Sequence, residues 1–402
     1  MKNNPFLLLA ASLSLAMIFT FSCSGDGSVI DSINNSGGSD IWDGRINTTW
    51  YDNSKKEFTI TTAQQLAGLA KLVNDYVDDF LGKTIKLGKD INLSGINWAP
   101  IGMEQTFAGT FDGNGYEIKG VKIKFSDNDS AFKGLFGALD LNGEIKNLGV
   151  IDSDIKGINA IGGLVGINNG KINKSYFIGI VEGNESVGGL VGRNILGTIS
   201  DSYSAGYVYG SEMHVGGLVG QNAGTISSCY STSIIFGKEG DVGGRYGVKL
   251  GGLVGYNYPG FGIIMNSYST GTVMGKIGVG GFVGLNESEI SNSYSIGTVS
   301  ADTLAGGFVG WNKGEISNSY SIGAVLGDSL IGGFVGFSQT GSTINNSFYN
   351  TETSKQSESD GGTGKTTAEM NEQATYTGWD FSTIWGLSST VNSGYPYLRS
   401  VQ

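Results

Sequence analysis

The chain has 402 residues, of which 68 are glycine and 4 are proline, and 39% of its residues are hydrophobic. The glycine content is far above the usual ~7%, the scarcity of proline excludes a collagen-like composition, and the apolar content is sufficient for a buried core. With 25 basic and 36 acidic residues the net charge is −11, which argues against a nucleic-acid partner because phosphates require a basic face.

The N-terminal segment MKNNPFLLLAASLSLAMIFTFSC predicts export. An apolar run of signal-peptide length is followed directly by polar residues, so we expect residues 1–22 to be a signal peptide. Thr20-Phe21-Ser22-Cys23 is similar to a bacterial lipobox, although threonine replaces the usual leucine. The similarity implies that Cys23 is lipidated and anchors the protein to the outer membrane or cell surface; the alternative is an ordinary cleaved signal peptide. Residues 23–41, rich in Ser, Gly, Asn and Asp, are expected to form a flexible tether.

Residues 42–133 are predicted to form an N-terminal cap and the first coils of a repeat structure. A helix is expected in ITTAQQLAGLAKLVNDYVDDF, with a capping box made by Thr61 and Gln64. The apolar residues at helical spacing are Leu66, Leu69, Ala70, Val73, Val77 and Phe80. Strands are expected in KTIKLGKDINL and GTFDGNGYEIKGVKI, the latter with a tight turn from Asp112 to Gly115.

Residues 134–350 repeat one phrase, of which GGFVGWNKGEISNSYSIG is an example, after a degenerate first copy that begins at Gly134. The phrase begins at Gly162, Gly188, Gly216, Gly251, Gly280, Gly306 and Gly332. Each copy is predicted to hold three short strands: the run through the glycine pair, Ile-Ser-Asn-Ser-Tyr-Ser, and Gly-Thr-Val. Such a unit cannot bury its own apolar face, whereas stacked copies bury a continuous core. The sequence therefore predicts an all-β fold, a right-handed parallel β-helix.

Several recurring residues are predicted to stack in columns along this solenoid. Asparagines that follow the first strand are expected to bond one another's amides at a turn: Asn168, Asn194, Asn222, Asn257, Asn286 and Asn312. An aromatic column could bind sugar, but packing is the favoured interpretation: Tyr176, Tyr203, Tyr230, Tyr268, Tyr294, Tyr320 and Phe348. Cys229 stands where the other copies have serine, so we expect a free structural thiol.

Residues 351–402 are predicted to form a C-terminal cap. A short helix is expected from about Thr367, and the aromatic residues Trp379, Phe381, Trp385 and the run Tyr395–Leu398 are expected to close the C-terminal edge.

The pattern GGLVGxNxGxIxNSYSxG resembles the GLUG motif of bacterial surface proteins, including non-catalytic parts of some immunoglobulin A proteases and large adhesins. The resemblance covers residues 134–350 and implies a surface-exposed β-helix, often assigned to adhesion. It supplies no catalytic residues, because the metalloproteases that carry such repeats need HExxH and this chain's single histidine is His214.

The search for catalytic chemistry yields one weak pattern. Glu289 and Glu315 are equivalent positions in adjacent copies, and so are Asp302 and Asp328. Carboxylates ~5 Å apart suit a retaining glycosidase or a weak cation site, whereas the simpler interpretation is a solvated surface column. His214 is interpreted as a solvent-exposed loop residue. We expect no enzyme activity, no catalytic residue, no metal and no cofactor.

A binding surface is predicted where the copies differ. The residue after GGLVG varies, and two insertions, KEGDVGGRYGVK and the turn YNYPGFG, flank the strand LGGLVGY. We expect the two insertions to form one protruding ledge that carries aromatic residues and arginine, a mixture typical of recognition surfaces. The predicted ligand-binding residues are Arg245, Tyr246, Tyr256, Tyr258, Phe261 and Trp311. The alternative is a variable loop without a role.

These features together predict a lipid-anchored, surface-displayed β-helix that binds a host or cell-surface glycan or glycoprotein and exists as a monomer. The alternatives are a carbohydrate-active β-helix enzyme, a polysaccharide-binding accessory protein, and a structural spacer without a ligand.

Overall fold

The computed structural model describes residues 42–124, 132–237 and 249–401, all of which belong to one compact unit, Ile41–Gln402. The predicted signal peptide and tether, with Cys23, lie outside the described residues, as do Arg245 and Tyr246. No helix in the described ranges is long and apolar enough to cross a membrane.

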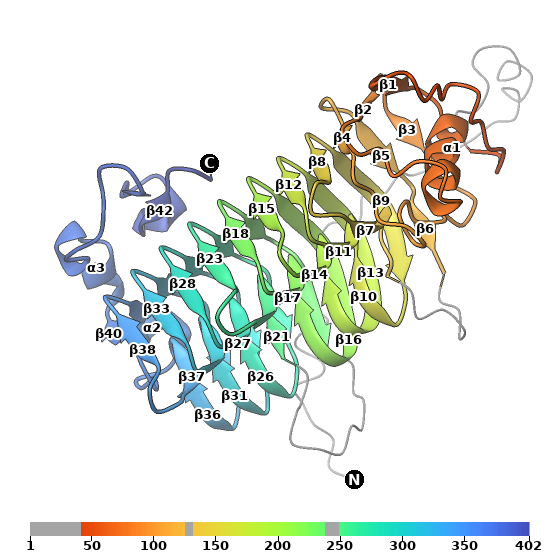
Figure 1. Ribbon diagram of the computed structural model, residues 1–402. Helices are drawn as coiled ribbons and strands as arrows, with labels where there is room; N and C mark the ends of the chain where they lie inside the picture. Colours follow the sequence, from red (N-terminus) through yellow and green to blue (C-terminus); the bar gives the residue numbers. More distant parts are fainter. Residues whose placement is uncertain (1–41, 125–131, 238–248, 402) are drawn as a thin grey trace, which may run out of the picture. The chain divides into compact units, whose positions relative to one another are not determined.

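The unit is a parallel β-solenoid, which confirms the predicted fold class (Figure 1). Successive coils add strands to three parallel sheets that run along the solenoid. We number the sheets by their order within one repeat. Because every strand pairs with its counterpart in the neighbouring coils, no coil is stable alone and the stack is the folding unit.

Sheet I is formed by the Val-Gly-x-Asn part of each repeat. Its strands, in order along the solenoid, are β7 (Phe136–Leu139), β11 (Val165–Asn168), β14 (Val191–Asn194), β17 (Val219–Asn222), β22 (Val254–Asn257), β27 (Val283–Asn286), β32 (Val309–Asn312) and β37 (Val335–Ser338).

Sheet II is formed by the x-Ile-Ser part. Its strands are β1 (Glu57–Ile60), β2 (Thr84–Leu87), β4 (Thr110–Asp112), β8 (Glu144–Lys146), β12 (Lys171–Asn173), β15 (Thr198–Ser200), β18 (Thr225–Ser227), β23 (Ile263–Met265), β28 (Glu289–Ser291), β33 (Glu315–Ser317) and β38 (Thr343–Asn345).

Sheet III takes the rest of each coil, from the tyrosine to the first glycine of the next phrase. Its strands are β3 (Ile91–Asn92), β5 (Glu117–Lys119), β6 (Lys122–Ile123), β9 (Gly149–Lys156), β10 (Asn159–Gly162), β13 (Tyr176–Gly188), β16 (Tyr203–Gly216), β19 (Tyr230–Ser231), β20 (Ile234–Gly237), β21 (Leu250–Gly251), β24 (Tyr268–Ser269), β25 (Val273–Met274), β26 (Ile277–Gly280), β29 (Tyr294–Ser295), β30 (Val299–Ser300), β31 (Thr303–Gly306), β34 (Tyr320–Ser321), β35 (Val325–Leu326), β36 (Ser329–Gly332), β39 (Phe348–Asn350) and β40 (Thr363–Lys365).

Two of the three predicted strand assignments are wrong, because corners of the coil fall inside them. The run through the glycine pair leaves sheet III at its first glycine and enters sheet I at the valine, as between β26 and β27. Close backbone contact requires glycine there: a Cβ on Gly252 would lie 2.0 Å from the carbonyl oxygen of Gly281. The run Ile-Ser-Asn-Ser-Tyr-Ser turns from sheet II into sheet III at a left-handed residue, such as Asn292 with φ 46°.

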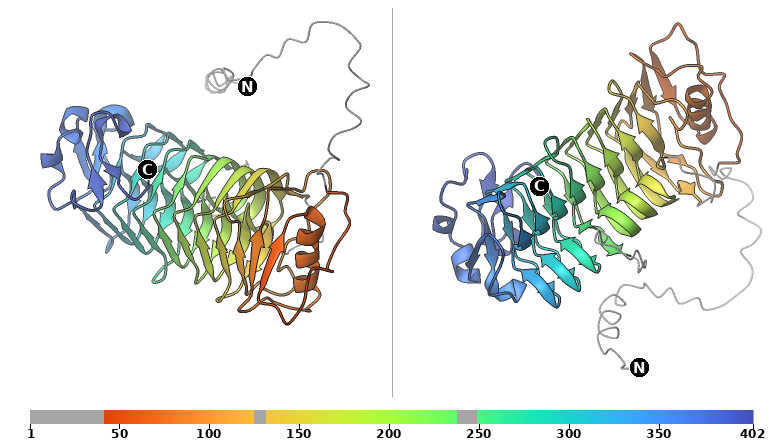
Figure 2. Two further views of the ribbon diagram at one scale, coloured as in Figure 1. Left: turned by 90° about the horizontal axis from the view of Figure 1, so that it is seen from above. Right: turned by 60° about the horizontal axis from the view of Figure 1, so that its bottom comes forward.

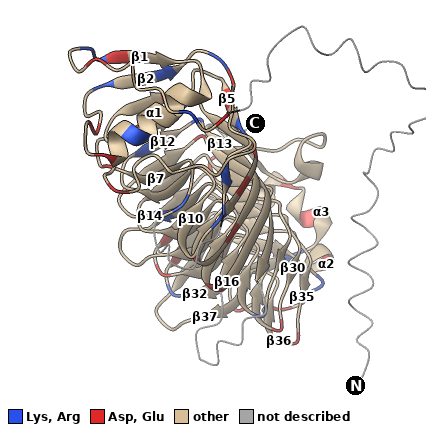
Figure 3. Cartoon of the chain, turned by 90° about the vertical axis from the view of Figure 1, so that its right-hand side faces the viewer, with Lys and Arg blue, Asp and Glu red and all other residues tan. Residues whose placement is uncertain are grey.

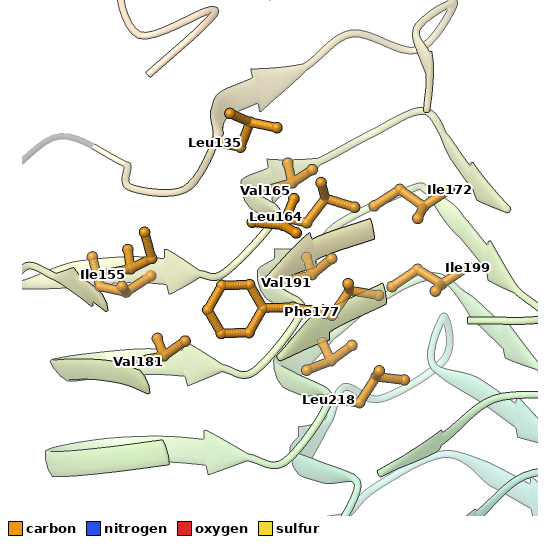
Figure 4. Packing of buried hydrophobic residues seen from close by; sticks show 14 of the residues in the cluster. Leu135, Ile155, Leu164, Val165, Ile172, Phe177, Val181, Val191, Ile199 and Leu218 are labelled. Atoms are coloured by element: carbon orange, nitrogen blue, oxygen red, sulfur yellow. The ribbon is translucent and has the colours of Figure 1, made fainter. Parts of the chain in front are cut away.

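The core lies inside the coils and is built from equivalent apolar positions. Figure 4 shows Leu164, Val165, Ile172, Phe177 and Val181 pointing toward one another from different sheets. All five are at most 1% exposed. In β22, with the sequence Val254-Gly255-Tyr256-Asn257, the valine and the asparagine are buried, whereas the third residue, Tyr256, faces outward. The valine and the third residue are two positions apart and would share a face in a regular strand, so the sheet I strands do not follow simple inside–outside alternation.

The predicted asparagine column is confirmed. Each side-chain amide donates to the Oδ1 of the asparagine in the next coil, at 2.8–2.9 Å in every step from Asn168 to Asn312. A serine column behaves similarly, since the backbone N–H of Ser293 donates to Oγ of Ser319 and the Ser293 hydroxyl donates to a backbone oxygen. Cys229 takes a serine's place there and is a buried free thiol, as predicted.

The tyrosine column packs ring upon ring. Centroids are 4.8–5.1 Å apart from Tyr176 to Tyr320, with interplanar angles of 2–6°. Each ring face is therefore covered by the next ring, and only edges and hydroxyls are left at the surface. A sugar needs a free ring face for stacking, so the structure favours packing as the role of this column.

The predicted N-terminal helix exists but is shorter. α1 (Ala63–Asn74) is capped by Thr62, whose hydroxyl accepts the N–H of Gln65, one residue later than expected. Val77 is 56% exposed beyond the helix, and Phe80 is buried with φ 63°, which no helix accommodates. Figure 3 shows several charged residues on β1 and β2, whereas many strands of the later coils carry none.

The C-terminal cap contains α2 (Thr351–Ser354), α3 (Thr367–Met370), the 3₁₀ turns η2 (Gln373–Thr375) and η3 (Asn392–Gly394), and the antiparallel pair β41 (Trp385–Gly386) and β42 (Tyr397–Leu398). The predicted aromatic-rich cap is confirmed, and different segments of it cover different parts of the last coils. The sheet I edge is covered by Ser359, whose Oγ accepts the N–H of Val335 at 2.8 Å. The aromatic residues of the cap instead cover the flank, where they bury Tyr294 and Tyr320. Figure 2 shows the C-terminal segments, in dark blue, against the last coils of the solenoid.

Candidate ligand-binding face

The third residue of each sheet I strand faces outward and differs between coils. The strand register pairs these residues from coil to coil, so they form one column, which we call the variable column: Ile167, Arg193, Gln221, Tyr256, Leu285, Trp311 and Phe337. The conserved geometry of the phrase thus displays a different side chain about every 4.8 Å along the solenoid.

A second column lies beside it, two residues before the first glycine of each phrase. We call it the flanking column: Ala160, Ser186, His214, Lys249, Gly278, Leu304 and Leu330. The two columns are in contact, since Nε of Arg193 donates to Oγ of Ser186 at 3.0 Å and the His214 ring lies 4.7 Å from the Tyr256 ring. Together they form one surface, the sheet I face.

A pocket of about 320 Å³ opens at the edge of this face, where the chain turns from sheet I toward sheet II. Its lining residues are Arg193, Asn194, Ile195, Leu196, Gln221, Ala223, Tyr258 and Phe261. Four of these are large apolar or aromatic side chains with high exposure: Ile195 39%, Leu196 60%, Tyr258 39% and Phe261 62%. Such residues are normally buried, so their clustering around a hollow indicates a binding surface.

The long turn after β22 holds Tyr258 and Phe261 in place. The N–H of Gly262 donates to the carbonyl oxygen of Tyr258 at 3.0 Å, and Gly260 adopts φ 76°, a left-handed conformation that suits glycine. The turn therefore projects two aromatic rings beyond the shorter turns of neighbouring coils.

Polar groups at the pocket retain hydrogen-bonding capacity. The side-chain amide of Gln221 makes no hydrogen bond with any described residue. Arg193 uses Nε and Nη2 within the protein, with Nη2 2.8 Å from Oε1 of Glu185. The pocket can therefore offer an amide donor and acceptor beside apolar rings, and its lining residues include no carboxylate.

The Tyr256 hydroxyl belongs to a charged hydrogen-bond network and is not free to contact a ligand. Its hydroxyl donates to Oε2 of Glu287 at 2.5 Å, and Lys313 pairs with the other carboxylate oxygen. Burial and the bond to Glu287 both raise the pKa of Tyr256. Burial alone would raise the pKa of Glu287, but the hydrogen bonds from Lys313 and Tyr256 outweigh it and hold that pKa below its ordinary value.

Trp311 lies further along the same face, between two lysines. Nζ of Lys313 is 4.4 Å and Nζ of Lys249 is 5.5 Å from the centre of its ring system, and Phe337 meets the ring edge-on at 6.1 Å. The buried indole N–H has no acceptor among the described residues.

The interpretation of His214 as an exposed loop residue is wrong. It belongs to β16, has φ 53°, and is largely covered where its ring stacks on Tyr256. Burial first, and then the charges of Arg193 and Lys249, lower its pKa to about 4. The sheet I face therefore contains a neutral imidazole at neutral pH, and its buried Nδ1 has no hydrogen-bond partner in the described part of the chain.

The structure thus brings four predicted site residues to one face. Tyr258 and Phe261 line the pocket, and the Tyr256 ring lies 5.5 Å from that of Tyr258. Trp311 lies two strands beyond Tyr256 in the variable column. Sequence reasoning did not select Ile195 and Leu196, which a count of apolar residues in turns would have found. It also missed His214 and Lys249, whose places depend on the path of the chain between sheets III and I.

The acidic pairs lie elsewhere. Glu289 and Glu315 are direct register partners on sheet II and both are exposed, and Asp328 follows Asp302 in the next coil, where its N–H donates to the Asp302 carbonyl. Within the described ranges no group of three or more His, Cys, Asp or Glu side chains could hold a metal ion.

The solenoid consists of near-identical coils that display variable side chains on one face. It therefore belongs to the class of repeat proteins in which the repeated residues build the framework and the variable residues form the surface. The family model for the GLUG motif matches residues 183–209, 211–235, 247–274 and 275–300. Residues 183–300 of this chain therefore carry GLUG-motif repeats.

Two curated relatives share parts of this sequence. Halomucin of Haloquadratum walsbyi is 32% identical over 120 residues, which cover 27% of this chain and 1% of halomucin. A protein of Evansella cellulosilytica, provisionally named a Gly-rich membrane protein, is 34% identical over 163 residues, which cover 30% of this chain and 19% of that protein. The chain therefore spans a small part of either relative.

The chain is also similar to two solved structures. One, from Bacteroides ovatus, is provisionally named an immunoglobulin A1 protease; it is 18% identical, with a TM-score of 0.49 over 87% of this chain and 94% of that one. The other, an IgA1 protease, is 17% identical, with a TM-score of 0.43 over 78% of this chain and 24% of that one. Neither likeness carries an argument about the activity of this chain.

Proposed function

We propose that this protein binds a glycan through the sheet I face and its pocket. The observation that carries the proposal is the exposed ring pair Tyr258 and Phe261 beside the side-chain amide of Gln221, which has no hydrogen-bond partner among the described residues. Aromatic faces suit the apolar face of a sugar ring, and a nearby amide can bond its hydroxyls. The alternative of a sugar-cleaving enzyme has less support, because the stacked carboxylates Glu289 and Glu315 are on sheet II and not at the pocket.

Glycan-array binding of the purified protein tests the proposal. Tyr258→Ala and Phe261→Ala are each expected to weaken binding by roughly tenfold to a hundredfold, the usual effect of removing a central aromatic contact. Tyr207→Ala is the matched control, since Tyr207 is a 44% exposed aromatic residue on sheet III, away from the pocket. Binding that survives both pocket substitutions, or that the control abolishes equally, contradicts the proposal.

We also propose surface display through a lipid on Cys23. The lipobox-like sequence supports this proposal, as do the names of the two relatives, halomucin and a Gly-rich membrane protein. In a bacterial host that processes lipoproteins, Cys23→Ala is expected to move the protein from the membrane fraction to the soluble fraction. An unchanged membrane fraction in the variant refutes lipidation at Cys23 as the anchor.

A further inference from the structure

Lys249 occupies an unusual position for a lysine. Its side chain is only 6% exposed, although it belongs to the flanking column at the surface of the solenoid. The residue above it in that column is Gly278, where a Cβ would lie 2.7 Å from Cδ and 3.0 Å from Nζ of Lys249. The absence of a side chain at Gly278 therefore makes room for the lysine to run along the face toward Trp311.

Two ammonium groups meet at Trp311, but only one has a counterion. Lys313 pairs with Glu287, whereas the ammonium group of Lys249 makes no hydrogen bond or ion pair with any described residue and lies near the indole ring. The indole N–H of Trp311 is also buried without an acceptor in the described part of the chain. Donors therefore accumulate at this point without matching acceptors.

A buried ammonium without an anion is unfavourable, and contact with an aromatic ring offsets only part of the lost hydration. Burial and the nearby charge of Lys313 both lower the pKa of Lys249, the opposite of what a paired lysine shows. What this arrangement lacks is an oxygen acceptor with negative charge. Supplying one would satisfy Lys249 and offset its repulsion from Lys313.

We propose that Lys249 and Trp311 form a subsite for one anionic oxygen group, a carboxylate or sulfate, of an acidic glycan that lies along the sheet I face. This inference rests on the proposed function, and it adds the chemical class of the glycan. Trp311 lies three strands beyond Gln221, from β17 to β32, which is about 14 Å along the solenoid. A single extended sugar chain can therefore contact the pocket with one unit and this subsite with another.

The test uses small anions and the indole resonance of Trp311 in the ¹⁵N-labelled protein, assigned by its loss in Trp311→Phe. Sodium glucuronate and sodium sulfate, at constant ionic strength, are expected to shift this resonance in a saturable manner. Lys249→Met is expected to weaken the apparent affinity at least tenfold. Lys171→Met, which removes an exposed lysine from sheet II, is the matched control and is expected to change nothing.

Several results would overturn the subsite: no saturable shift, an equal shift with sodium chloride, or an unchanged affinity in Lys249→Met. A response to inorganic phosphate alone, with none to glucuronate or sulfate, would overturn its assignment to acidic sugars. Calorimetric titration of glucuronate into Trp311→Phe gives a second measurement that does not need the resonance, with weaker binding expected and unchanged binding contradicting the role of Trp311.

Failure of this inference is distinguishable from failure of the proposed function. Array binding of neutral glycans that depends on Phe261, without any response to anions, refutes the subsite and leaves the pocket. Saturable anion binding that depends on Lys249, in a protein that binds no glycan, supports the anion subsite and refutes the glycan function.

Discussion

The asparagine column makes a quantitative prediction about stability, best tested at Asn257. This side chain is fully buried and accepts from Nδ2 of Asn222 at 2.9 Å. It donates to Oδ1 of Asn286 at 2.9 Å and to the carbonyl oxygens of Gly262 at 3.1 Å and Glu289 at 3.4 Å. Asn257→Ala removes all four hydrogen bonds at once. It leaves one donor and three acceptors without their bond to this side chain.

The expected cost follows from these partners. A buried polar group that loses its partner costs roughly 1–3 kcal/mol. Oδ1 of Asn286 still accepts the N–H of Ser288 at 3.3 Å, and Nδ2 of Asn222 still donates to Gly224, so neither is wholly unsatisfied. We therefore expect Asn257→Ala to lower the free energy of unfolding by about 4 kcal/mol, well below the maximum for four groups that lose every partner.

Asn292→Gly is the matched control in the second asparagine column. Asn292 is half-exposed, its Oδ1 accepts a long 3.4 Å bond from Asn318, and its φ of 46° is one that glycine adopts freely. We expect this substitution to change the free energy of unfolding by less than about 1 kcal/mol. The pair thus separates a buried amide ladder from a turn residue of the same type.

Urea unfolding followed by circular dichroism measures the difference, and hydrogen exchange locates it. Since each coil contacts only its neighbours, lost protection should concentrate in β17, β22 and β27 and spare β1 and β2. A shift for Asn257→Ala no larger than that for Asn292→Gly would refute the view that the amide ladder stabilises the solenoid. Uniform loss of protection over all coils would refute its local character.

Three further predictions concern single residues of the framework. The unfolded chain protonates His214 near pH 6.5 but the folded protein only at about 4, so its contribution is complete above pH 6.5 and is lost as the pH falls toward 4. On acidification from pH 7 to pH 4.5, the free energy of unfolding should therefore fall by about 2–3 kcal/mol less in His214→Gln than in the parent protein. If the free energy of unfolding of the two proteins changes in parallel with pH, this prediction is wrong. Burial raises the pKa of the Cys229 thiol to about 12, so iodoacetamide should label Cys229 only in the unfolded protein; rapid labelling under native conditions would show the coil to be open. Gly252→Ala places a Cβ 2.0 Å from a backbone oxygen and should prevent a stable fold, whereas Gly260→Ala, with nothing within 4 Å, should cost only about 1 kcal/mol of strain; equal melting temperatures for these two variants would refute the close-packed corner.

The sequence by itself determined the features that repeat. Copies that differ little must occupy equivalent environments, so the stacked Asn257 and its counterparts, the tyrosine column and the buried Cys229 followed from periodicity alone. The presence of a capping helix followed from the spacing of Leu66 and Leu69, because local periodicity reflects the face that a helix buries.

Only the tertiary structure decided where each coil turns and which side chains meet on its surface. The corner within the glycine run arises from backbone contacts between coils, as at Gly252, which one repeat cannot reveal. His214 and Lys249 reach Tyr256 and Trp311 because the chain passes from sheet III to sheet I beside them. A repeated sequence specifies its core through local pattern, but a surface made of residues from different coils exists only after the coils have stacked.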